Sequence, residues 1–467
     1  MHSGGASMID LTKYKNIHCI GIGGIGVSAL AEIMISRGYK VSGSDMKESA
    51  ITDHLASMGV KIQIGHRAEN VEDADLIVYS AAIAETNPEV VRAKELGIPM
   101  IPRAELLGTL MNEHPNSIAV SGTHGKTTTT SMISLIIRNA ALDPTIVVGG
   151  ELAEIGGNVR VGHGDYFVAE ACEYRDSFLQ LRPKIEIILN IDSDHLDYFK
   201  DVDHIEASFE KFAGFVPDDG MIIAYDSNPF VEEATKGKHN VIRYGYNSNS
   251  DYHIVNVRFR EGYPSFDVEH NGEKLGHVEL SVPGEHNILN ATAAFACCNQ
   301  LGIDTEVIVD TLKNFTGIQR RFNVRGMFGN GVRLVDDYAH HPTEIKATLT
   351  GAEKFPHEKL WVVFQPHTYT RTLALFDGFA DALEEADVII LADIYAAREK
   401  DIYNVSSEKL AKTIHEQKPD KEVLYMPDFH EIADYVRKNA QKGDMVITMG
   451  AGDIYKVGDY ILEAENK

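Results

Sequence analysis

The segment Gly122–Thr127 is the feature that most constrains what this chain can fold into. It follows a short apolar run at 118–120 that predicts a strand, and it leads into apolar residues at helical spacing between 132 and 137. In a strand–turn–helix of this kind, glycines admit an anion to the backbone N–H groups, the helix N-terminus adds its dipole, and a lysine adds a full charge. The sequence therefore predicts an ATP site made by Gly122, Thr123, His124, Gly125, Lys126, Thr127 and Thr128.

The spacing of this loop departs from that of the common P-loop. Only Thr123 and His124 separate the two glycines, where four residues are usual. An ordinary glycine turn before a helix is the alternative, but it gives no reason for Lys126 and Thr127 to follow the second glycine directly. A hydroxyl in that position can bind the magnesium ion that accompanies ATP.

A second glycine loop, Gly21–Gly26, lies between a predicted strand, Asn16–Ile20, and a predicted helix. The next strand ends at Asp45, about where dinucleotide folds place an acidic residue on ribose, so the motif alone predicts NAD. The loop chemistry requires only a diphosphate, which a UDP-sugar also carries, and glycines that serve only packing are a further alternative. His66 and Arg103 follow predicted strands, where solvated or core roles compete with substrate contact. The candidate substrate residues are Gly21, Gly23, Gly24, Ile25, Gly26, Asp45, His66 and Arg103.

Composition narrows the class of protein. The 467 residues carry a formal net charge of −25, which excludes a sequence-wide attraction to nucleic acid or anionic lipid. The four cysteines form no CxxC pair, which is typical of a reduced, cytoplasmic protein. No apolar run approaches the roughly 20 residues of a membrane span. We expect small-molecule partners, no nucleic acid and no membrane, and the oligomeric state stays open.

The length and the order of motifs predict an α/β protein of three domains. A polar, proline-containing stretch at 112–116 and the segment 315–322 give the boundaries 1–113, 114–320 and 321–467. The central domain opens with the ATP loop, and alternating residues around Asn271-Gly272 predict β-hairpins between 251 and 282. Strands at 332–335, 360–364 and 444–448 predict a second doubly wound sheet in the third domain.

Polar residues at predicted strand ends and helix starts complete the central site. Glu170 ends a strand and is placed to hold magnesium opposite Thr127, although a capping or surface role is the alternative. His195, beside three carboxylates, is either a metal ligand or a proton handler, and such acidic clusters are often solvated helix starts. Asn287 and Asn290 share a helix face and could read a base edge, unless Asn287 only caps the helix.

A paired arginine, Arg320-Arg321, lies at the second domain boundary and suggests a phosphate contact at the domain junction, with surface charge as the alternative. The stretch 336–342 follows a strand and contains His340-His341. Adjacent residues of a strand point to opposite faces, so both histidines cannot bind one ion. We expect polar substrate contacts there.

Together these motifs resemble the Mur ligases of peptidoglycan synthesis, over essentially the whole chain from about Lys15. The ATP motifs are shared across that family, whereas the first glycine loop, the double-histidine stretch and the Thr-Arg-Thr stretch favour its alanine-adding branch. Thr368, where some members have Arg, and Cys172–Arg175 are departures from the family pattern. The resemblance is carried by 21–31, 122–127, Glu170, 194–195, 286–287, Asn290, 320–322, 336–342 and 367–372.

The resemblance implies a Rossmann-like N-terminal sheet, a central P-loop ATPase-like α/β domain with β-hairpins, and a C-terminal Rossmann-like domain. It implies that ATP phosphorylates the carboxylate of UDP-N-acetylmuramate and that the amine of L-alanine attacks the acyl phosphate. The first glycine loop would then bind UDP rather than NAD. Because all three domains would contribute residues, closure is expected to accompany catalysis.

The resemblance also implies roles for single residues. Lys126 would neutralise the transferring phosphoryl group, Thr127 and Glu170 would hold one Mg²⁺ or Mn²⁺, and His195 a second ion. The remaining implied contacts are Asn287 and Asn290 at the nucleotide, Arg321 and Asp337 closing over it, and Tyr338, His341 and Arg371 at the amino acid and the carboxylate.

Three other functions compete with this one. An NAD-dependent oxidoreductase leaves Lys126 and Glu170 without a task, and a non-catalytic nucleotide-binding regulator would not need to keep either residue. The nearest alternative is a ligase that attaches a preassembled peptide to the same sugar nucleotide.

Overall fold

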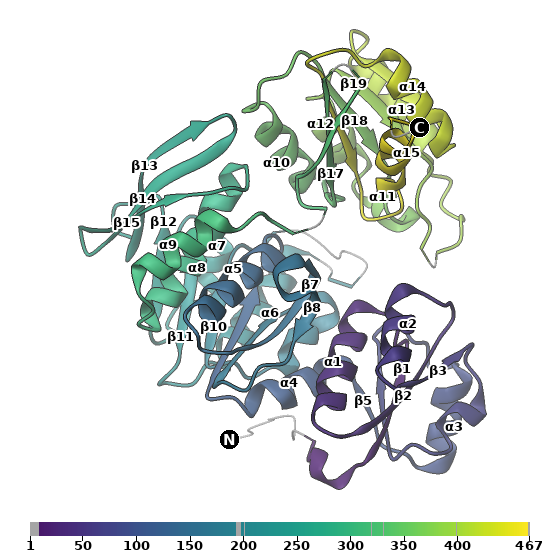
Figure 1. Ribbon diagram of the computed structural model, residues 1–467, viewed down its shortest axis with the longest axis vertical. Helices are drawn as coiled ribbons and strands as arrows, with labels where there is room; N and C mark the ends of the chain where they lie inside the picture. Colours follow the sequence, from purple (N-terminus) through teal and green to yellow (C-terminus); the bar gives the residue numbers. More distant parts are fainter. Residues whose placement is uncertain are drawn as a thin grey trace. The chain divides into compact units, whose positions relative to one another are not determined.

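The structure, a computed structural model, describes residues 9–192, 198–199, 201–318, 320–329, 331–397 and 399–465. Three parallel-rich sheets with their helices follow one another along the chain (Figure 1), so the predicted three-domain α/β fold is confirmed. The described residues divide into two compact units. One contains the first sheet and the parallel part of the central sheet, and the other contains the hairpin strands and the third sheet.

The first sheet has five strands in the order β3-β2-β1-β4-β5, and every pair is parallel. Parallel strands need crossover connections, and here helices supply most of them. The elements are η1 (Leu11–Lys13), β1 (Asn16–Ile20), α1 (Ile25–Ser36), β2 (Lys40–Asp45), α2 (Ala50–Ser57), β3 (Lys61–Ile64), η2 (Ala68–Val71), β4 (Leu76–Tyr79), α3 (Pro88–Leu96), β5 (Met100–Pro102) and α4 (Arg103–Asn112).

A glycine on β2 lets the first glycine loop lie directly on the sheet. A Cβ at Gly43 would lie 2.4 Å from Ile22 Cδ1 and 2.8 Å from the carbonyl oxygen of Cys19. Any larger residue there would push the loop away from the strand. The start of α1 is thereby fixed at the carboxyl edge of the sheet, where open α/β sheets bind ligands.

The parallel part of the central sheet runs β12-β11-β10-β6-β9-β7-β8, and only its last pair, β7 with β8, is antiparallel. Its central strand β6 is buried over five of its six residues and leads straight into the predicted ATP loop. The elements are β6 (Asn116–Ser121), α5 (Lys126–Asn139), β7 (Thr145–Leu152), η3 (Ala153–Ile155), β8 (Gly157–Arg160), β9 (Tyr166–Glu170), η4 (Tyr174–Gln180), β10 (Ile185–Ile188), α6 (Val202–Ala213), β11 (Met221–Tyr225), α7 (Pro229–Ala234) and β12 (Val241–Gly245).

The predicted β-hairpins are present. Strands β13 (Tyr252–Arg260), β14 (Tyr263–His270) and β15 (Glu273–Glu279) form an antiparallel meander. Asn271 and Gly272 both have positive φ, as a two-residue turn of type I′ requires. The helices α8 (Glu285–Gln300) and α9 (Thr305–Asn314) follow. Among the described residues, no helix is long and apolar enough to cross a membrane.

The third sheet runs β16-β17-β21-β18-β19-β20 and is parallel except for β16 against β17. Its elements are β16 (Asn323–Phe328), β17 (Val332–Asp337), α10 (Pro342–Ala352), β18 (Leu360–Phe364), α11 (Tyr369–Ala374), α12 (Phe376–Leu383), β19 (Val388–Leu391), α13 (Ser407–Gln417), β20 (Glu422–Tyr425), α14 (Phe429–Asn439), β21 (Met445–Met449) and α15 (Tyr455–Glu465).

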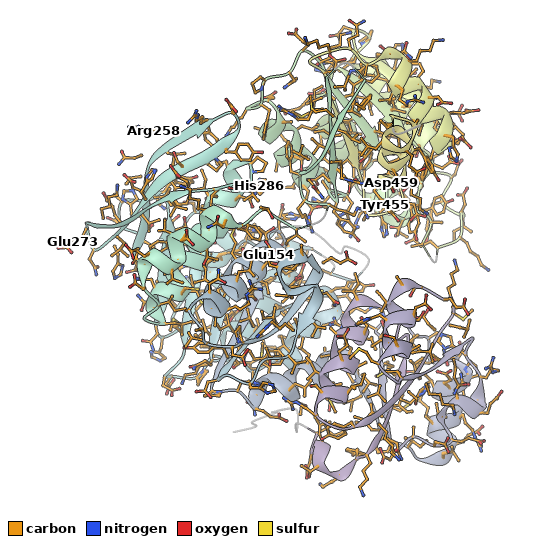
Figure 2. The ribbon with its side chains drawn as sticks, viewed as in Figure 1. Glu154, Arg258, Glu273, His286, Tyr455 and Asp459 are labelled. Carbon is orange, nitrogen blue, oxygen red and sulfur yellow. The ribbon has the colours of Figure 1, made fainter. Side chains whose placement is uncertain are left out.

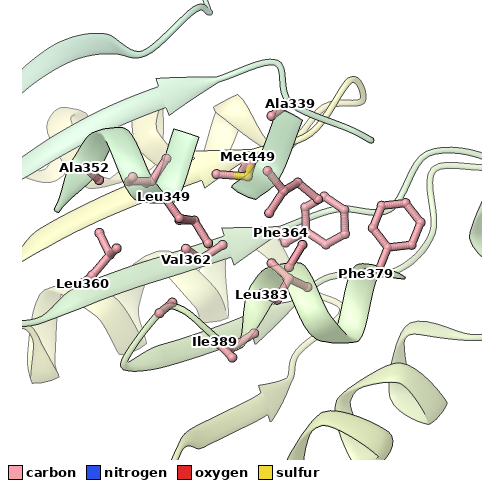
Figure 3. Packing of buried hydrophobic residues seen from close by; sticks show 14 of the residues in the cluster. Ala339, Leu349, Ala352, Leu360, Val362, Phe364, Phe379, Leu383, Ile389 and Met449 are labelled. Atoms are coloured by element: carbon pink, nitrogen blue, oxygen red, sulfur yellow. The ribbon is translucent and has the colours of Figure 1, made fainter. Parts of the chain in front are cut away.

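Helices cover both faces of this third sheet. Along β18, Leu360, Val362 and Phe364 join one buried cluster, whereas Trp361 and Val363 join another. Figure 3 shows the first cluster in close-up. The alternation places successive side chains on opposite faces, and it explains why the strand reads as a continuous apolar run. The sheet is thus a rigid base for the loops at the carboxyl ends of β17, β18 and β21.

Candidate active site

The ATP loop is shaped by two glycines and held by an asparagine. Gly122 has φ +132° and Gly125 has φ +86°, values that other residues rarely adopt. The side chain of Asn190 accepts a hydrogen bond from His124 N (2.8 Å) and donates one to His124 O (3.0 Å), and its carbonyl accepts one from Thr123 N (3.0 Å). Asn190 was not among the residues predicted for the site. Its position just beyond the carboxyl end of β10 was the available signal.

Lys126 begins α5, and the protein itself supplies three acceptors for its ammonium group. The Nζ atom donates to the carbonyl oxygens of Gly122 and Thr123 and lies 2.9 Å from an oxygen of Glu173. Burial lowers the pKa of Lys126, but the charge and hydrogen bond of Glu173 together with the neighbouring Cys172 and Glu170 outweigh it, and the net shift of the pKa is upward. Lys126 is therefore a fixed cation at the start of a helix, as an anion site requires. The pairing of Lys126 with Glu173 was not predicted from the sequence.

Two residues beside this loop have oxygen atoms that could bind a metal ion. Glu170 ends β9, and its carboxylate accepts a hydrogen bond from Gly149 N, while Thr127 lies in the first turn of α5. Carboxylate and hydroxyl oxygens suit a hard cation such as Mg²⁺, which takes its other ligands from phosphates and water. Across the described residues, no three or more His, Cys, Asp and Glu side chains gather into a metal-binding group. His195, the predicted ligand of a second ion, lies outside the described residues.

The first glycine loop is tied to the end of β2. Gly21 N and Ile22 N donate to Ser44 O at 2.8 and 3.0 Å, and Gly23 N donates to Asp45 Oδ2 at 2.9 Å. The predicted contact of Asp45 with a ligand stays a prediction, since the structure shows this carboxylate holding the loop.

Two further predicted substrate residues lie at the same edge of the first sheet. The Arg103 guanidinium approaches Gly26 so closely that a Cβ there would lie 2.8 Å from Nη1. His66 follows β3, with Nδ1 3.1 Å from Ser44 Oγ. Asn158 on β8 donates to Ile25 O at 2.9 Å, which links this loop to the central sheet within the same unit.

At the second predicted domain boundary, Arg320 and Arg321 differ in role. Arg320 Nε lies 3.2 Å from Asp336 Oδ2, Nη2 donates to Gly450 O, and the guanidinium lies over the rings of Tyr338 and Tyr455. Tyr455, the first residue of α15, is labelled in Figure 2. These contacts make Arg320 a structural residue. Arg321 is more exposed, with Nη1 3.7 Å from an oxygen of Glu344, so it is the better candidate for an anionic ligand.

Asp337, the last residue of β17, is a buried carboxylate that orders the chain around it. Its oxygens accept hydrogen bonds from Phe322 N and Ala339 N, both at 2.7 Å. Burial raises the pKa of Asp337 to about 6, although the charge of Arg321 opposes the shift. The group therefore titrates just below neutral pH.

A histidine pair lies beside Arg371. The rings of His340 and His367 have centroids 6.1 Å apart, and His367 stacks on Tyr395. Burial lowers the pKa of His340, and burial together with the neighbouring His340 lowers the pKa of His367 to about 4. Both imidazoles are therefore neutral at pH 7, near a guanidinium. The sequence predicts substrate contacts around His340-His341 and names only His341 as a site residue, so His340 and His367 are additions from the structure.

Other predicted contacts are already engaged within the protein. His341 Nδ1 accepts a hydrogen bond from Thr343 N (3.2 Å) and so caps α10. Asn290 Nδ2 donates to Asn287 Oδ1 (3.1 Å), and Asn287 Nδ2 donates to Pro283 O (2.6 Å). The substrate role of His341 and the nucleotide role of the two asparagines stay predictions.

Thr368 has an unusual backbone for a β-branched residue, with φ +65° and ψ 147°. Such conformations cost about 1–3 kcal/mol and occur mostly at functional sites. The surrounding contacts hold it there, because Thr368 N donates to Tyr395 O at 2.9 Å and Thr372 Oγ1 donates to Thr368 O at 2.6 Å. This strain lies three residues from Arg371, at the histidine pair.

Comparison with known proteins matches the chain to the Mur ligases. The profiles described as "Mur ligase family, catalytic domain", "Mur ligase middle domain" and "Mur ligase, glutamate ligase domain" match residues 16–115, 120–298 and 320–452. UDP-N-acetylmuramate–L-alanine ligases from Acetivibrio thermocellus and Caldanaerobacter subterraneus are each 51% identical, covering 98% of this chain and 97% and 99% of theirs. The structure of UDP-N-acetylmuramate–alanine ligase from Thermotoga maritima is 28% identical, with a TM-score of 0.82 over 97% of this chain and 99% of that one. A murein peptide ligase from Psychrobacter arcticus is 25% identical, with a TM-score of 0.73 over the same shares.

Proposed function

Because the chain belongs to the Mur ligase family, we propose that it is the ATP-dependent ligase that joins L-alanine to UDP-N-acetylmuramate in peptidoglycan synthesis. The observation that carries this function is the loop Gly122–Lys126, a rigid anion cradle with a fixed cation at the N-terminus of α5. That arrangement suits phosphoryl transfer, because this reaction depends mainly on the positioning of the phosphates and the neutralisation of their charge.

The reaction has two steps. An oxygen of the muramyl carboxylate attacks the γ-phosphorus of ATP, ADP leaves, and an acyl phosphate forms. The amine of L-alanine then attacks the acyl carbon, and the tetrahedral intermediate expels inorganic phosphate as the amide forms and one proton is released. In the first step, Lys126 offsets charge on the phosphoryl oxygens, and the N-terminus of α5 holds the phosphates.

Magnesium fits the donors beside the loop. Thr127 and Glu170 would hold Mg²⁺, or Mn²⁺, and the predicted His195 would hold a second ion. When bound, the ion would neutralise charge on the β- and γ-phosphates. The hydrogen bond from Gly149 N to Glu170 supports this role, because it orients the carboxylate at the end of β9.

The first glycine loop would hold the diphosphate of UDP-N-acetylmuramate. Its amides and the N-terminus of α1 suit any diphosphate, so the loop does not itself distinguish UDP from NAD. The proposed reaction distinguishes UDP from NAD, because a nicotinamide has no role in an acyl-phosphate mechanism. The link from Asn158 to Ile25 supports placing this ligand and ATP on the same unit.

The third domain would supply the alanine site. The guanidinium of Arg371 suits a carboxylate. The neutral imidazoles of His340 and His367 can accept hydrogen bonds from an amine without repelling it, in addition to the roles predicted for Tyr338 and His341. Arg321 and Asp337 would contact the nucleotide.

The substrates support a cytoplasmic location, since ATP and nucleotide sugars are cytoplasmic compounds. The cysteines are consistent with this location, because all four are free thiols: Cys19, Cys172, Cys297 and Cys298. The proposed partners are the small-molecule substrates.

ADP release measured with UDP-N-acetylmuramate, with and without L-alanine, tests the function. We expect sustained ADP release only when both are present, and a product heavier by one alanyl residue in mass spectrometry. A parallel reaction with the preassembled tripeptide in place of alanine tests the nearest alternative. Faster turnover of the tripeptide would assign the chain to the peptide-attaching branch, and the absence of ADP release with either acceptor would refute the ligase function.

A further inference from the structure

A buried carboxylate lies beneath the first glycine loop, and no step of the proposed reaction uses it. Glu89 has no solvent exposure, although carboxylates are rarely buried unless they are paired. The start of α3 fixes its position, because Asn87 caps the helix by accepting a hydrogen bond from Glu89 N (2.8 Å) and Pro88 follows the cap. The helix N-terminus also favours a negative charge there.

One oxygen of Glu89 holds the end of β2 and the second residue after β3. Ser44 Oγ donates to Glu89 Oε2 at 2.6 Å, and His66 Nδ1 lies 3.1 Å from Ser44 Oγ and 3.5 Å from Glu89 Oε2. Since the hydroxyl proton points to the carboxylate, Ser44 accepts from His66. The relay from His66 through Ser44 to Glu89 therefore fixes Nδ1 as the inward, donating nitrogen.

The other oxygen of Glu89 holds the segment that carries His66. It accepts a hydrogen bond from Asn70 Nδ2, which also donates to Gly65 O at 3.1 Å. His18 Nε2 approaches the carboxylate at 3.5 Å. Burial would raise the pKa of Glu89, but the hydrogen bonds from His18, Ser44 and Asn70 outweigh it and lower the pKa. The carboxylate is thus ionised and surrounded by donors.

The relay ends at the ligand edge of the sheet. The carbonyl of Ser44 accepts hydrogen bonds from the N–H groups of Gly21 and Ile22. Ser44, which is bonded to Glu89, therefore also holds the glycine loop in place. His66 keeps part of its side chain exposed, at 12%. With Nδ1 turned inward, Nε2 is the nitrogen available to a ligand at the carboxyl edge of the strands.

We propose that Glu89 is a positioning residue of the sugar-nucleotide site, which acts through Ser44 and His66 on the uridine diphosphate portion of the ligand. This inference rests on the proposed function, because it takes a nucleoside diphosphate as the ligand of the first glycine loop. Glu89 itself touches no ligand. Its carboxylate sets the direction in which His66 offers Nε2 and holds Ser44 under the loop.

Glu89→Gln in the full-length protein tests this role, because it keeps the side-chain shape and removes the charge. We expect the Kd for UDP and the KM for UDP-N-acetylmuramate to rise about 10- to 100-fold, the range for losing a hydrogen bond to a charged group. The KM for ATP and kcat should stay within about twofold. Circular dichroism and ATP binding report whether the variant is folded.

A double-mutant cycle with His66→Ala separates positioning from general support. If Glu89 acts in part through His66, the loss in the double variant is smaller than the sum of the two single losses, whereas independent structural roles give additive losses. Ser42→Ala is the matched control. It removes the partner of His18 on the same strand (Nδ1 to Oγ 2.9 Å) and leaves the relay to His66 intact, so UDP binding should not change.

The outcomes are distinguishable. Unchanged UDP binding in a folded Glu89→Gln variant, or additive effects with His66→Ala, would overturn the positioning role while wild-type ligation stands. A wild-type protein that binds no UDP and makes no alanyl product would instead overturn the proposed function.

Discussion

Replacing Lys126 with Met is expected to lower both the thermal stability of the protein and its rate of ligation, for different reasons. The Glu173 side chain, 3% exposed, would lose its cation, while that of Lys126 is 15% exposed. Removing one partner of a buried ion pair costs about 3–5 kcal/mol, and we take about 3 because water can reach the lysine side. For a domain of this size, about 3 kcal/mol corresponds to a melting temperature lower by about 6–12 °C. Ligation should fall at least about 10³-fold, because a phosphoryl clamp is lost.

A second substitution separates the two effects. In Lys126→Met/Glu173→Gln no buried charge is left unpaired, so the melting temperature should return close to that of the wild type while ligation stays lost. Lys184→Met is the control, because Lys184 pairs with an exposed carboxylate, Asp219, and such surface pairs contribute about 0–1 kcal/mol. Differential scanning fluorimetry and coupled ADP release give the two readings. A single variant that melts like the wild type would refute the pairing, and a double variant that regains ligation would refute the clamp.

Three further predictions concern metal, sugar nucleotide and pH. Glu170→Gln is expected to raise the Mg²⁺ concentration for half-maximal activity about tenfold or more, since a hard cation loses a carboxylate ligand; an unchanged titration would return Glu170 to a structural role. Gly23→Val places a Cβ 2.9 Å from Asp45 Oδ2, so isothermal calorimetry should show weaker UDP-N-acetylmuramate binding and intact ATP binding, and equal loss of both ligands would contradict the assignment. Asp337 has a pKa raised by burial to about 6, so its stability contribution is fully present below its usual 3.8 and is lost as pH rises through about 6. Its ionised form accepts two backbone hydrogen bonds, so the KM for ATP should rise as pH falls through about 6, and this dependence should be absent in Asp337→Asn.

Local pattern was enough to predict the elements that carry the loops. Strands β1 and β18 have the predicted bounds and β9 ends at Glu170 as predicted, because an apolar run before a turn is a strong local signal. The turn at Asn271-Gly272 was equally predictable, since its residues select the turn type.

Partners distant in the chain were not predictable. Glu173 pairs with Lys126 across 47 residues, and Glu89 reaches Ser44 across 45. Nothing in the local sequence separates these glutamates from surface ones, because their burial is decided by how β9 and α3 pack. The sequence favoured His341 over His340, and local pattern could not show that the cap of α10 engages the His341 ring while the His340 ring lies toward His367.

The strand order of the first sheet has a consequence for how the protein is synthesised. The chain begins this sheet in the middle: β1, β2 and β3 are complete by residue 64, whereas β4, the other neighbour of β1, comes at 76–79. As the chain emerges from the ribosome, the backbone N–H and C=O groups along the β4-facing edge of β1 therefore stay unpaired until β4 arrives. The side chains of Ile17, Cys19 and Ile20 on this strand are buried in the folded protein, and an unpaired edge of such an apolar strand is a template for wrong pairing with another chain. Slowed translation between residues 64 and 79 is thus expected to increase aggregation more than the same delay after residue 102, where all five strands are present.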